Sequence, residues 1–387
     1  MPLSGATILQ VIPHLSAGGA ERTTIEVAEA LVAAKATALV LSAGGRLEGE
    51  LSRVGGELIH FDNAPTKNPV LIYAHAGSIA KIIRERKVDL VHGRSRAPAW
   101  SAMWAARRMK KPFVTTYHGV YKAKDRLKRW YNSVMARGDV VIANSDYTAA
   151  HIRDQHLFAA SRIVTIPRGV DISKFSGDKV SPVRQAALEA EWLISRADRP
   201  AVILLPARMT AWKGHREAIA AAALMASKQG LSWRMIFAGD AQGRESYLEE
   251  LRQLISSHGL DDRIAIVGHC DDMPAALALA DIVIAPSNEP EAFGRVAAEA
   301  GAMGKPVIGS AIGAQREVIS DGETGLLIPP SSPAALADAM TELLQRGPAG
   351  RDVMGKAAIA RIRERFTTAA LQNATLAVYD RLIGRPA

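Results

Sequence analysis

Two glutamates at a fixed spacing are the first residues whose types could do chemistry. Glu291 and Glu299 lie in the stretch EPEAFGRVAAEAGAMGKPVIGS, which covers residues 289–310. The preceding DIVIAPS has the composition of a buried strand, and residues 295–303 have that of a helix ended by Gly304. We therefore expect Glu291 in a loop and Glu299 on the helix that follows it.

The start of that helix is a candidate anion site. The N–H groups of a first helical turn lack partners inside the helix, and Gly294 allows a ligand to approach the backbone. A ligand with a central phosphate and hydroxyl-rich ends fits, and a nucleotide sugar is such a ligand. For the two acids taken alone, an acidic helix start with one solvated glutamate is the better explanation. The residues expected around the phosphate are Ala292, Phe293, Gly294 and Arg295.

Two cations follow another strand-like run. AVILLP is followed by ARMTAWKGHREAI, which places Arg208 and Lys213 in a loop that enters a helix. A guanidinium and an ammonium side by side there would neutralise a diphosphate, whereas each alone would be an ordinary surface charge.

Three residues of the first half also follow strand-like runs. Gly18 and Gly19 in HLSAGGAERT lie between a strand and a helix, which is typical of a turn that approaches phosphate and of a plain tight turn. His118 in TTYHGV follows a later strand. In the second half, Val267 and Gly268 begin the VGHCDD loop, where we expect a nucleobase.

The elements that position these residues alternate along the whole chain. Short β-branched runs separated by amphipathic stretches predict an α/β protein with parallel, doubly wound sheets. The expected strands are 7–12, 38–42, 57–61, 88–92, 112–118, 139–144 and 162–166, then 201–206, 233–239, 263–267, 281–286, 306–309 and 325–328. The polar stretch 171–200 between the two sets predicts a linker between two domains.

Composition limits the alternatives. Of 387 residues 48% are hydrophobic and 22% charged, which is typical of a folded globular chain. The single cysteine, Cys270, and a start without a basic signal region favour a cytoplasmic protein. Neither G-x-G-x-x-G nor G-x-x-x-x-G-K-[ST] occurs, which disfavours a dinucleotide-dependent dehydrogenase and a P-loop NTPase.

Taken together, these motifs resemble the retaining glycosyltransferases of family 4, which have the GT-B fold. The resemblance covers almost the whole chain, and the E-x7-E pair Glu291 and Glu299 is its most specific element. It implies two Rossmann-like domains facing a cleft, with a C-terminal helix crossing back to the first domain. The implied domains are an acceptor-binding domain at 1–177, a linker with a nucleotide-sugar domain at 178–365, and the returning helix at 366–387.

The resemblance also implies roles. Glu291 would contact the donor sugar, Glu299 the ribose, Arg208 and Lys213 the diphosphate, and His118 the reacting sugar. The implied catalytic set is therefore His118, Arg208, Lys213 and Glu291, with Gly18, Gly19, Val267 and Gly268 as further donor contacts. PRGVD carries Arg168 where many relatives have asparagine.

GRSRAPAW, VTTYHG and GDAQGRESY are most similar to alphaproteobacterial lipopolysaccharide-core mannosyltransferases. The expected reaction is therefore hexose transfer, with mannose from GDP-mannose favoured, to a lipopolysaccharide-core or related glycolipid. A UDP-sugar donor for another surface glycan, or a GT-B sugar-nucleotide epimerase or hydrolase, is the alternative. We expect no cofactor and no metal, because no Asp-x-Asp follows a strand-like run.

Positive charge is concentrated in the first half. Residues 1–180 contain 26 lysines and arginines against 15 acids, within a total net charge of +9. No nucleic-acid motif accompanies them, so we expect an anionic acceptor or peripheral contact with the inner face of the membrane. Leu127, Trp130, Tyr131, Val134 and Met135 form a stripe that core packing or membrane contact explains equally. The expected contact residues are Arg94, Arg96, Lys122, Lys124, Lys128 and Arg129.

Overall fold

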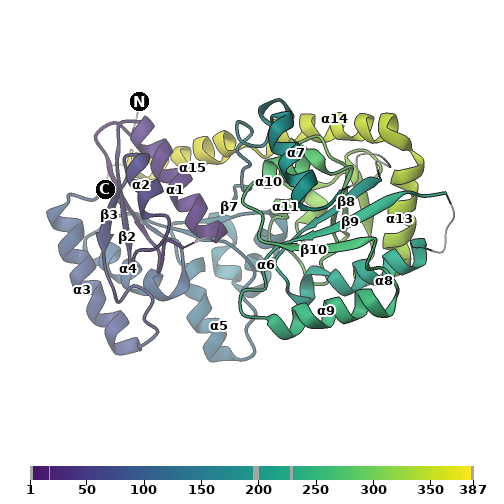
Figure 1. The fold of residues 1–387 in the computed structure, drawn as a ribbon. Coiled ribbons are helices and arrows are strands. Elements are labelled where there is room, and N and C mark those ends of the chain that lie inside the picture. The colour runs from purple at the N-terminus through teal and green to yellow at the C-terminus, as the bar shows by residue number, and fades with distance from the viewer. Residues whose placement is uncertain (1–2, 17, 195–199, 227–229, 385–387) are drawn as a thin grey trace. The chain divides into compact units, whose positions relative to one another are not determined.

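The structure is a computed structural model that describes residues 3–16, 18–194, 200–226 and 230–384. It forms two compact units, the first made of residues 1–168 with 368–387 and the second of residues 169–367. Each unit contains one parallel sheet with helices packed on both faces (Figure 1).

The sheet of unit 1 has seven strands in the order β3-β2-β1-β4-β5-β6-β7. Their bounds are β1 (Thr7–Val11), β2 (Thr37–Ser42), β3 (Glu57–His60), β4 (Leu90–Gly93), β5 (Phe113–Tyr117), β6 (Val140–Ala143) and β7 (Ile163–Thr165). The helices are α1 (Gly19–Ala33), α2 (Glu48–Arg53), α3 (Pro69–Glu85), α4 (Arg96–Arg108), α5 (Arg126–Asn132), α6 (Asp146–Gln155) and α15 (Thr368–Ile383). Short 3-10 turns cover Ser133–Ala136 and Leu157–Arg162.

Alternate residues of these strands feed two cores. Leu9 and Val91 face α3 and α4, whereas Ile8 and Leu90 face α1 and α15. The last helix belongs to this unit because Tyr379 hydrogen-bonds His92 of β4, and Gln372 Nε2 donates to the Glu26 carbonyl of α1 over 2.8 Å. All of these strand residues are fully buried, as expected for a parallel sheet covered on both sides.

Unit 2 has six strands in the order β10-β9-β8-β11-β12-β13. They are β8 (Ala201–Pro206), β9 (Trp233–Ala238), β10 (Ile264–Gly268), β11 (Ile282–Ala285), β12 (Val307–Ser310) and β13 (Gly325–Ile328). The helices are α7 (Pro182–Glu191), α8 (His215–Ala226), α9 (Glu245–Ser257), α10 (Met273–Leu279), α11 (Arg295–Ala302), α12 (Gln315–Val318), α13 (Pro333–Gln345) and α14 (Gly347–Arg365). Further 3-10 turns cover Gly177–Lys179 and Ala211–Lys213.

The α/β class and both doubly wound sheets predicted from the sequence are confirmed, and all thirteen expected strands correspond to β1–β13. The segment after Arg168 packs with unit 2, where Val170 N donates to the Phe366 carbonyl over 2.8 Å. The first stretch of unit 1 thus ends at residue 168, whereas the expected boundary was residue 177. Residues 195–199 of the expected linker lie outside the described residues.

Within the described ranges, no helix combines the length and the apolar composition that crossing a bilayer requires.

Candidate active site

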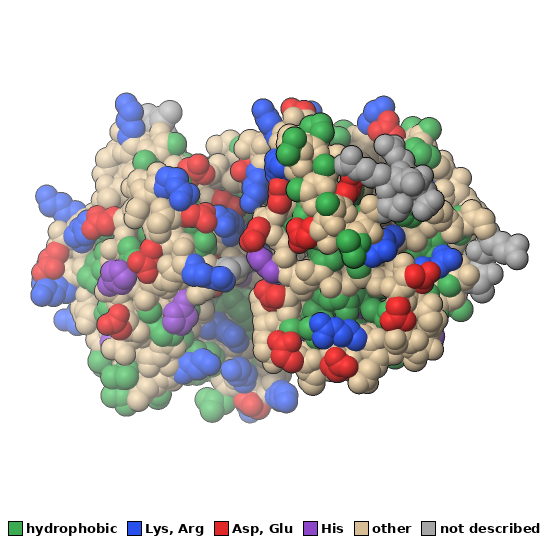
Figure 2. Space-filling model, viewed as in Figure 1, with side chains coloured by type: hydrophobic (Ala, Val, Ile, Leu, Met, Phe, Trp, Pro, Cys, Tyr) green, Lys and Arg blue, Asp and Glu red, His purple; other side chains and the backbone are tan. Residues whose placement is uncertain are grey.

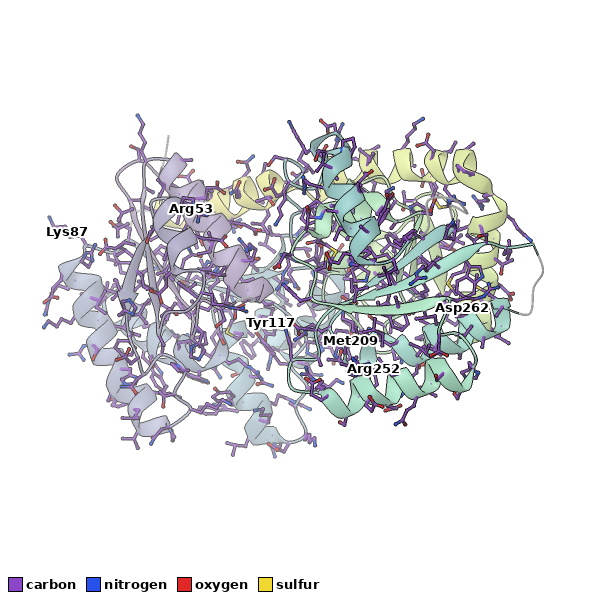
Figure 3. All side chains as sticks on the ribbon, in the orientation of Figure 1. Arg53, Lys87, Tyr117, Met209, Arg252 and Asp262 are labelled. Atoms are coloured by element: carbon purple, nitrogen blue, oxygen red, sulfur yellow. The ribbon has the colours of Figure 1, made fainter. Side chains whose placement is uncertain are left out.

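In unit 2 the loops after β8 and β11 lie where the sheet changes its direction of winding. Strands β9 and β10 follow β8 on one side, and β12 and β13 follow β11 on the other. Ligands of such sheets bind outside the carboxyl ends of the strands at this switch point. Asn288 N donates to the Trp212 carbonyl over 2.8 Å, which ties the two loops together. Figure 3 labels Met209, next to Arg208, in the first loop.

The two loops bring Lys213 and Glu291 into contact. Lys213 Nζ donates to Glu291 Oε1 over 2.8 Å, and the side chains are only 13% and 11% exposed. The same oxygen accepts from Ser287 Oγ at 2.6 Å and from Gln315 Nε2 at 3.3 Å. The Lys213 ammonium also lies 4.2 Å from the centroid of the Trp212 ring. Three donors therefore fix the carboxylate, and the carboxylate in turn fixes the ammonium group.

Sequence reasoning missed Ser287 and Gln315 as partners of this pair. Ser287 directly follows the expected strand DIVIAP, so its place at the strand end was available as a signal. No sequence signal pointed to Gln315. It begins the four-residue helix α12 and contacts Glu291 only in the folded chain.

Gly214 explains how Lys213 reaches the second loop. Its φ is 80°, in the left-handed region, and a Cβ there would lie 2.0 Å from the Pro286 carbonyl oxygen. Only glycine fits both the conformation and the approach. The turn Ala211–Lys213 can therefore close directly against the loop after β11.

The start of α11 supplies backbone donors close by in the chain. Gly294 caps the helix with φ 83°, and no side chain caps its first turn. Phe293 is 4% exposed and packs against Phe366, with ring centroids 6.0 Å apart, so this residue can offer a ligand its backbone only. Ala292 and Arg295 flank it, half-buried. Backbone N–H groups at an uncapped helix start suit an oxyanion.

Glu299 lies one turn further along α11. Its side chain is 16% exposed, and its Oε1 lies 3.7 Å from Arg295 Nη1. As expected, one glutamate of the pair stands in the loop and the other on the helix.

Two other expected donor contacts, Arg208 and Gly268, have hydrogen-bond partners of their own. Arg208 is exposed, and its Nη1 lies 3.5 Å from Gln242 Oε1. Val267 and Gly268 end β10 at the edge of the sheet, where Gly268 has φ 75° and its carbonyl accepts from Gly239 N over 2.6 Å. Their roles toward a nucleotide stay predictions.

In unit 1 two of the expected residues, His118 and Gly19, lie against Arg168. His118 follows β5, after Tyr117, which Figure 3 labels, and Gly18 and Gly19 begin α1. Arg168 Nη2 lies 3.2 Å from His118 Nδ1. Burial, together with the positive charges of Arg168 and Arg94, holds the pKa of His118 well below its ordinary value, so the imidazole is neutral at pH 7.

The expected contact cations divide into two groups. Arg94 is 2% exposed and donates from Nε to Gln10 Oε1 over 2.9 Å, so it does not lie on a surface that could meet a membrane, and its contact with an acceptor stays a prediction. Arg96 is half-buried, with its guanidinium 4.4 Å from the Tyr121 ring centroid. The others are exposed over α5 and the loop before it (Figure 2), namely Lys122, Lys124, Lys128 and Arg129.

The residues of the apolar stripe differ in burial. Val134 and Met135 are fully buried in the core of unit 1, whereas Leu127 and Trp130 are 75% and 52% exposed. An open groove of about 430 Å³ lies beside them, and Trp100 stacks on Trp130 within it at a centroid distance of 4.7 Å. The buried members of the stripe thus lie in the 3-10 turn Ser133–Ala136, whereas the two exposed members lie on α5 itself.

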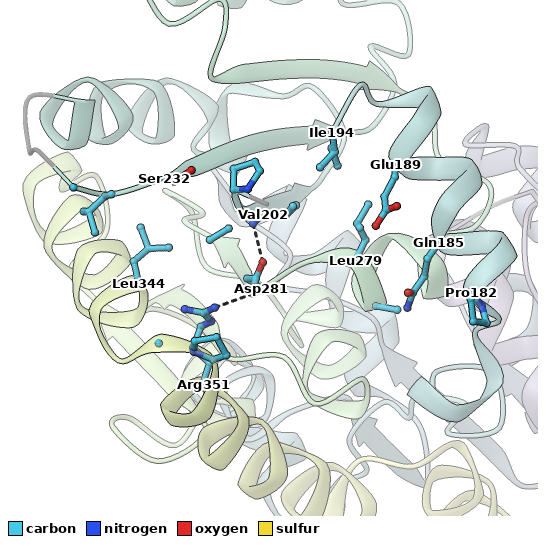
Figure 4. A pocket seen from close by; sticks show the side chains of 17 residues that line it. Pro182, Gln185, Glu189, Ile194, Val202, Ser232, Leu279, Asp281, Leu344 and Arg351 are labelled. Atoms are coloured by element: carbon cyan, nitrogen blue, oxygen red, sulfur yellow. Dashed lines mark hydrogen bonds and ion pairs between the residues drawn. The ribbon is translucent and has the colours of Figure 1, made fainter. Parts of the chain in front are cut away.

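The large cavity of unit 2 lies away from the switch point. It measures about 750 Å³ and is lined by residues at the amino ends of β8 and β11 (Figure 4). Two of its charges are already paired, because Asp281 accepts from Arg351 Nη2 and also from Val202 N, each over 2.9 Å. Among the described residues no three His, Cys, Asp or Glu side chains gather as metal ligands, and metal independence stays a prediction.

Comparison with known proteins adds the family. The model for glycosyl transferases group 1 matches residues 192–361, and that for glycosyltransferase family 4 matches residues 17–174. A glycosyltransferase structure from Rickettsia africae is 33% identical, with a TM-score of 0.91 over 99% of this chain and all of that one. The chain belongs to the glycosyltransferases, and the family 4 model matches its first part. Its fold is GT-B, as the resemblance implied.

The names of two further relatives of this glycosyltransferase include a ligand or a substrate. A D-inositol 3-phosphate glycosyltransferase of Xylanimonas cellulosilytica is 30% identical over 277 residues, which are 66% of this chain and 63% of that protein. The chain thus spans less than two thirds of that relative's length. Anabaena Alr3699/HepE, solved in complex with UDP and glucose, is 25% identical, with a TM-score of 0.79 over 97% of this chain and 99% of that one.

Proposed function

We propose that this glycosyltransferase transfers a hexose from a nucleoside diphosphate sugar to a glycolipid acceptor, with retention of configuration and without a metal ion. The observation that carries the proposal is the Lys213–Glu291 pair at the switch point of unit 2, next in the chain to the uncapped start of α11. Cation and backbone donors suit a diphosphate, and the carboxylates suit hydroxyl groups.

The chemistry follows from where charge develops. As the bond between the anomeric carbon and the β-phosphate oxygen breaks, negative charge grows on the leaving diphosphate. Lys213, Arg208 and the N–H groups at Gly294 would stabilise that charge, which is the preorganised electrostatic contribution that usually dominates such catalysis. The acceptor hydroxyl forms the new bond on the same face and gives its proton to a phosphate oxygen. No protein nucleophile is needed, and His118 is assigned to positioning the hexose.

Mannose from GDP-mannose is the preferred donor, and a lipopolysaccharide-core glycolipid the preferred acceptor. This choice rests on the resemblance of residues 93–100 and 114–119 to mannosyltransferases of that class. The UDP complex of the Anabaena protein and the inositol phosphate acceptor named for the Xylanimonas relative make a UDP-sugar donor and a phosphorylated polyol acceptor the alternatives.

The direct experiment is a transfer assay with GDP-mannose and UDP-sugars, each with and without an extracted core glycolipid. The proposal expects acceptor-dependent release of one nucleoside diphosphate, an α-linked product from an α-linked donor, and full activity in excess EDTA. Turnover of the donor without any acceptor would identify an epimerase or hydrolase instead. Loss of activity in EDTA would contradict the metal-free mechanism.

The acceptor proposal includes contact with the inner face of the membrane through α5. Exposed Leu127 and Trp130 stand beside exposed cations, and each cation contributes about 1 kcal/mol of attraction near an anionic bilayer. We expect the enzyme to sediment with anionic liposomes at low salt. A variant with four cations changed to Gln should not sediment; the positions are Lys122, Lys124, Lys128 and Arg129.

A matched control changes four exposed cations of unit 2 to Gln, and this control should bind liposomes like the wild type; the positions are Arg252, Lys356, Arg363 and Arg365. Equal binding by both quadruple variants, or no binding by the wild type, would contradict membrane contact through α5.

A further inference from the structure

Arg168 connects two loops that the sequence places far apart. It stands after β7, at the end of the first stretch of unit 1, and its Nη2 lies 3.2 Å from His118 Nδ1 and 3.4 Å from the His118 carbonyl oxygen. The same guanidinium lies against Gly19 at the start of α1, where a Cβ would be 2.0 Å from Nη1. The absence of a side chain at Gly19 is what leaves room for Arg168.

In the hydrogen bond between Arg168 and His118, only Arg168 can be the donor. A guanidinium carries five N–H donors and no acceptor, and it keeps its proton in proteins. His118 Nδ1 must therefore accept the hydrogen bond, which leaves the single proton of the neutral imidazole on Nε2. His118 Nε2 is buried and has no hydrogen-bond partner among the described residues.

We propose that Arg168 is a positioning residue that fixes His118 as the Nε2–H tautomer, so that His118 offers a ligand oxygen a hydrogen-bond donor. In this state Nε2 has no lone pair with which to take a proton from an acceptor hydroxyl. His118 then holds a hydroxyl or ring oxygen of the hexose instead of acting as the base. This last step rests on the proposed function, whereas the tautomer itself does not.

The surroundings of His118 support a neutral ring. Besides Arg168, the charged or titratable groups that face it are Arg94 and His92 from β4 and its loop, and Tyr121 from the segment after β5. Burial lowers the pKa of His118, and the two arginines lower it further. A second proton on Nδ1 would also place an N–H donor opposite the guanidinium, which has no acceptor.

The direct test is long-range ¹H–¹⁵N NMR of the histidine rings in the free protein, with His118 assigned from its loss in His118→Gln. The wild type should show the Nε2–H pattern alone. Arg168→Leu should give a mixture of tautomers, and Arg168→Lys, which keeps a donor, should restore Nε2–H. A proton on Nδ1 in the wild type, or an unchanged pattern in Arg168→Leu, would overturn the proposal.

Two glycine variants provide a second route that leaves Arg168 in the chain. A Cβ in Gly19→Ala would displace the guanidinium, so His118 should lose its single tautomer as in Arg168→Leu. In the matched control Gly18→Ala the Cβ would meet the Glu21 carboxylate, 2.2 Å away, and the His118 pattern should not change. Equal spectra for the two alanine variants would contradict the role given to the Arg168 contact.

Kinetics separates this proposal from the proposed function. If Arg168 acts through His118, Arg168→Leu should lower kcat about 10-fold, the effect expected for one net hydrogen bond. Adding Arg168→Leu to His118→Gln should then lower kcat no further. Additive losses would overturn the positioning role. If no sugar nucleotide is turned over at all, the proposed function fails, while the NMR result on the free protein still decides the tautomer.

Discussion

Lys213 Nζ and Glu291 Oε1 lie 2.8 Å apart, although the two residues are separated by 78 positions in the sequence. The ammonium and the carboxylate are each more than four-fifths buried, and Ser287 and Gln315 hold the same carboxylate oxygen. A charge so enclosed keeps its position before any ligand arrives. Lys213 is thus held in place in the loop after β8, as the proposed anion site requires.

Removing the ammonium should therefore impair catalysis more than folding. We expect Lys213→Ala to lower kcat on the order of 100-fold, because it removes one preorganised charge from the leaving diphosphate. Arg216→Ala is the control, since Arg216 is exposed and paired with Glu250. Wild-type turnover in Lys213→Ala would remove the lysine from the mechanism, and an equal loss in Arg216→Ala would show a general effect on the fold.

Replacing Glu299 and replacing Glu291 should change different steps, nucleotide binding in the first case and turnover in the second. Glu299→Ala should weaken nucleoside diphosphate binding by about 1.5–3 kcal/mol, the value of a hydrogen bond to a charged group. Glu291→Ala should mainly lower kcat, because Glu291 is assigned to the reacting hexose and also holds Lys213. Titration calorimetry and steady-state kinetics on both variants measure this. Unchanged nucleotide affinity in Glu299→Ala would sink the ribose assignment.

Gly214 should be more sensitive than another glycine of similar conformation. Gly214→Ala combines a left-handed φ with a Cβ 2.0 Å from the Pro286 carbonyl oxygen, so it should destabilise unit 2 and displace Lys213. Gly243→Ala has φ 81° but no heavy atom within 4 Å of the new Cβ, and only backbone strain of about 1 kcal/mol is expected. Denaturant unfolding compares the two. Equal losses of stability would mean that the close approach contributes nothing.

The strands and the strand-end positions of the candidate site were predictable from sequence. Buried parallel strands appear as short apolar runs, and ligand residues of such sheets follow the strands. This rule correctly placed Glu291, Lys213 and His118 in the segments that follow strands. These predictions need only local composition and one topological rule.

Pairings between distant side chains were not predictable in this way. That Gln315 reaches Glu291, and that Arg168 reaches His118, depends on how separate loops pack. Arg94 was expected to contact an acceptor or the membrane, yet it is buried and Gln10 Oε1 of β1 accepts from its guanidinium. Contacts between such distant residues leave no periodic pattern in the sequence.

The stability of unit 2 should fall in mild acid because of His215. This residue begins α8, directly after Gly214, and burial lowers its pKa to about 4. Its pKa in the unfolded chain is about 6.5, so below that pH the unfolded state binds the proton first and folding loses free energy. Between pH 7 and pH 5 the expected loss is on the order of 2 kcal/mol.

The control for this pH dependence is His215→Gln. Urea unfolding at both pH values should give the variant a smaller loss of stability than the wild type. The same loss in both proteins would show that other groups carry the acid sensitivity.

Titration calorimetry with GDP, UDP and ADP tests the central claim most directly, using the wild type and Lys213→Ala. The claim is that the switch point of unit 2 binds the diphosphate of a sugar nucleotide through Lys213, Glu291 and the start of α11. The account predicts that one of the three nucleotides binds the wild type, without added metal, and that Lys213→Ala binds it at least 10-fold more weakly. Failure of all three to bind the wild type, or equal affinity in the variant, would contradict it.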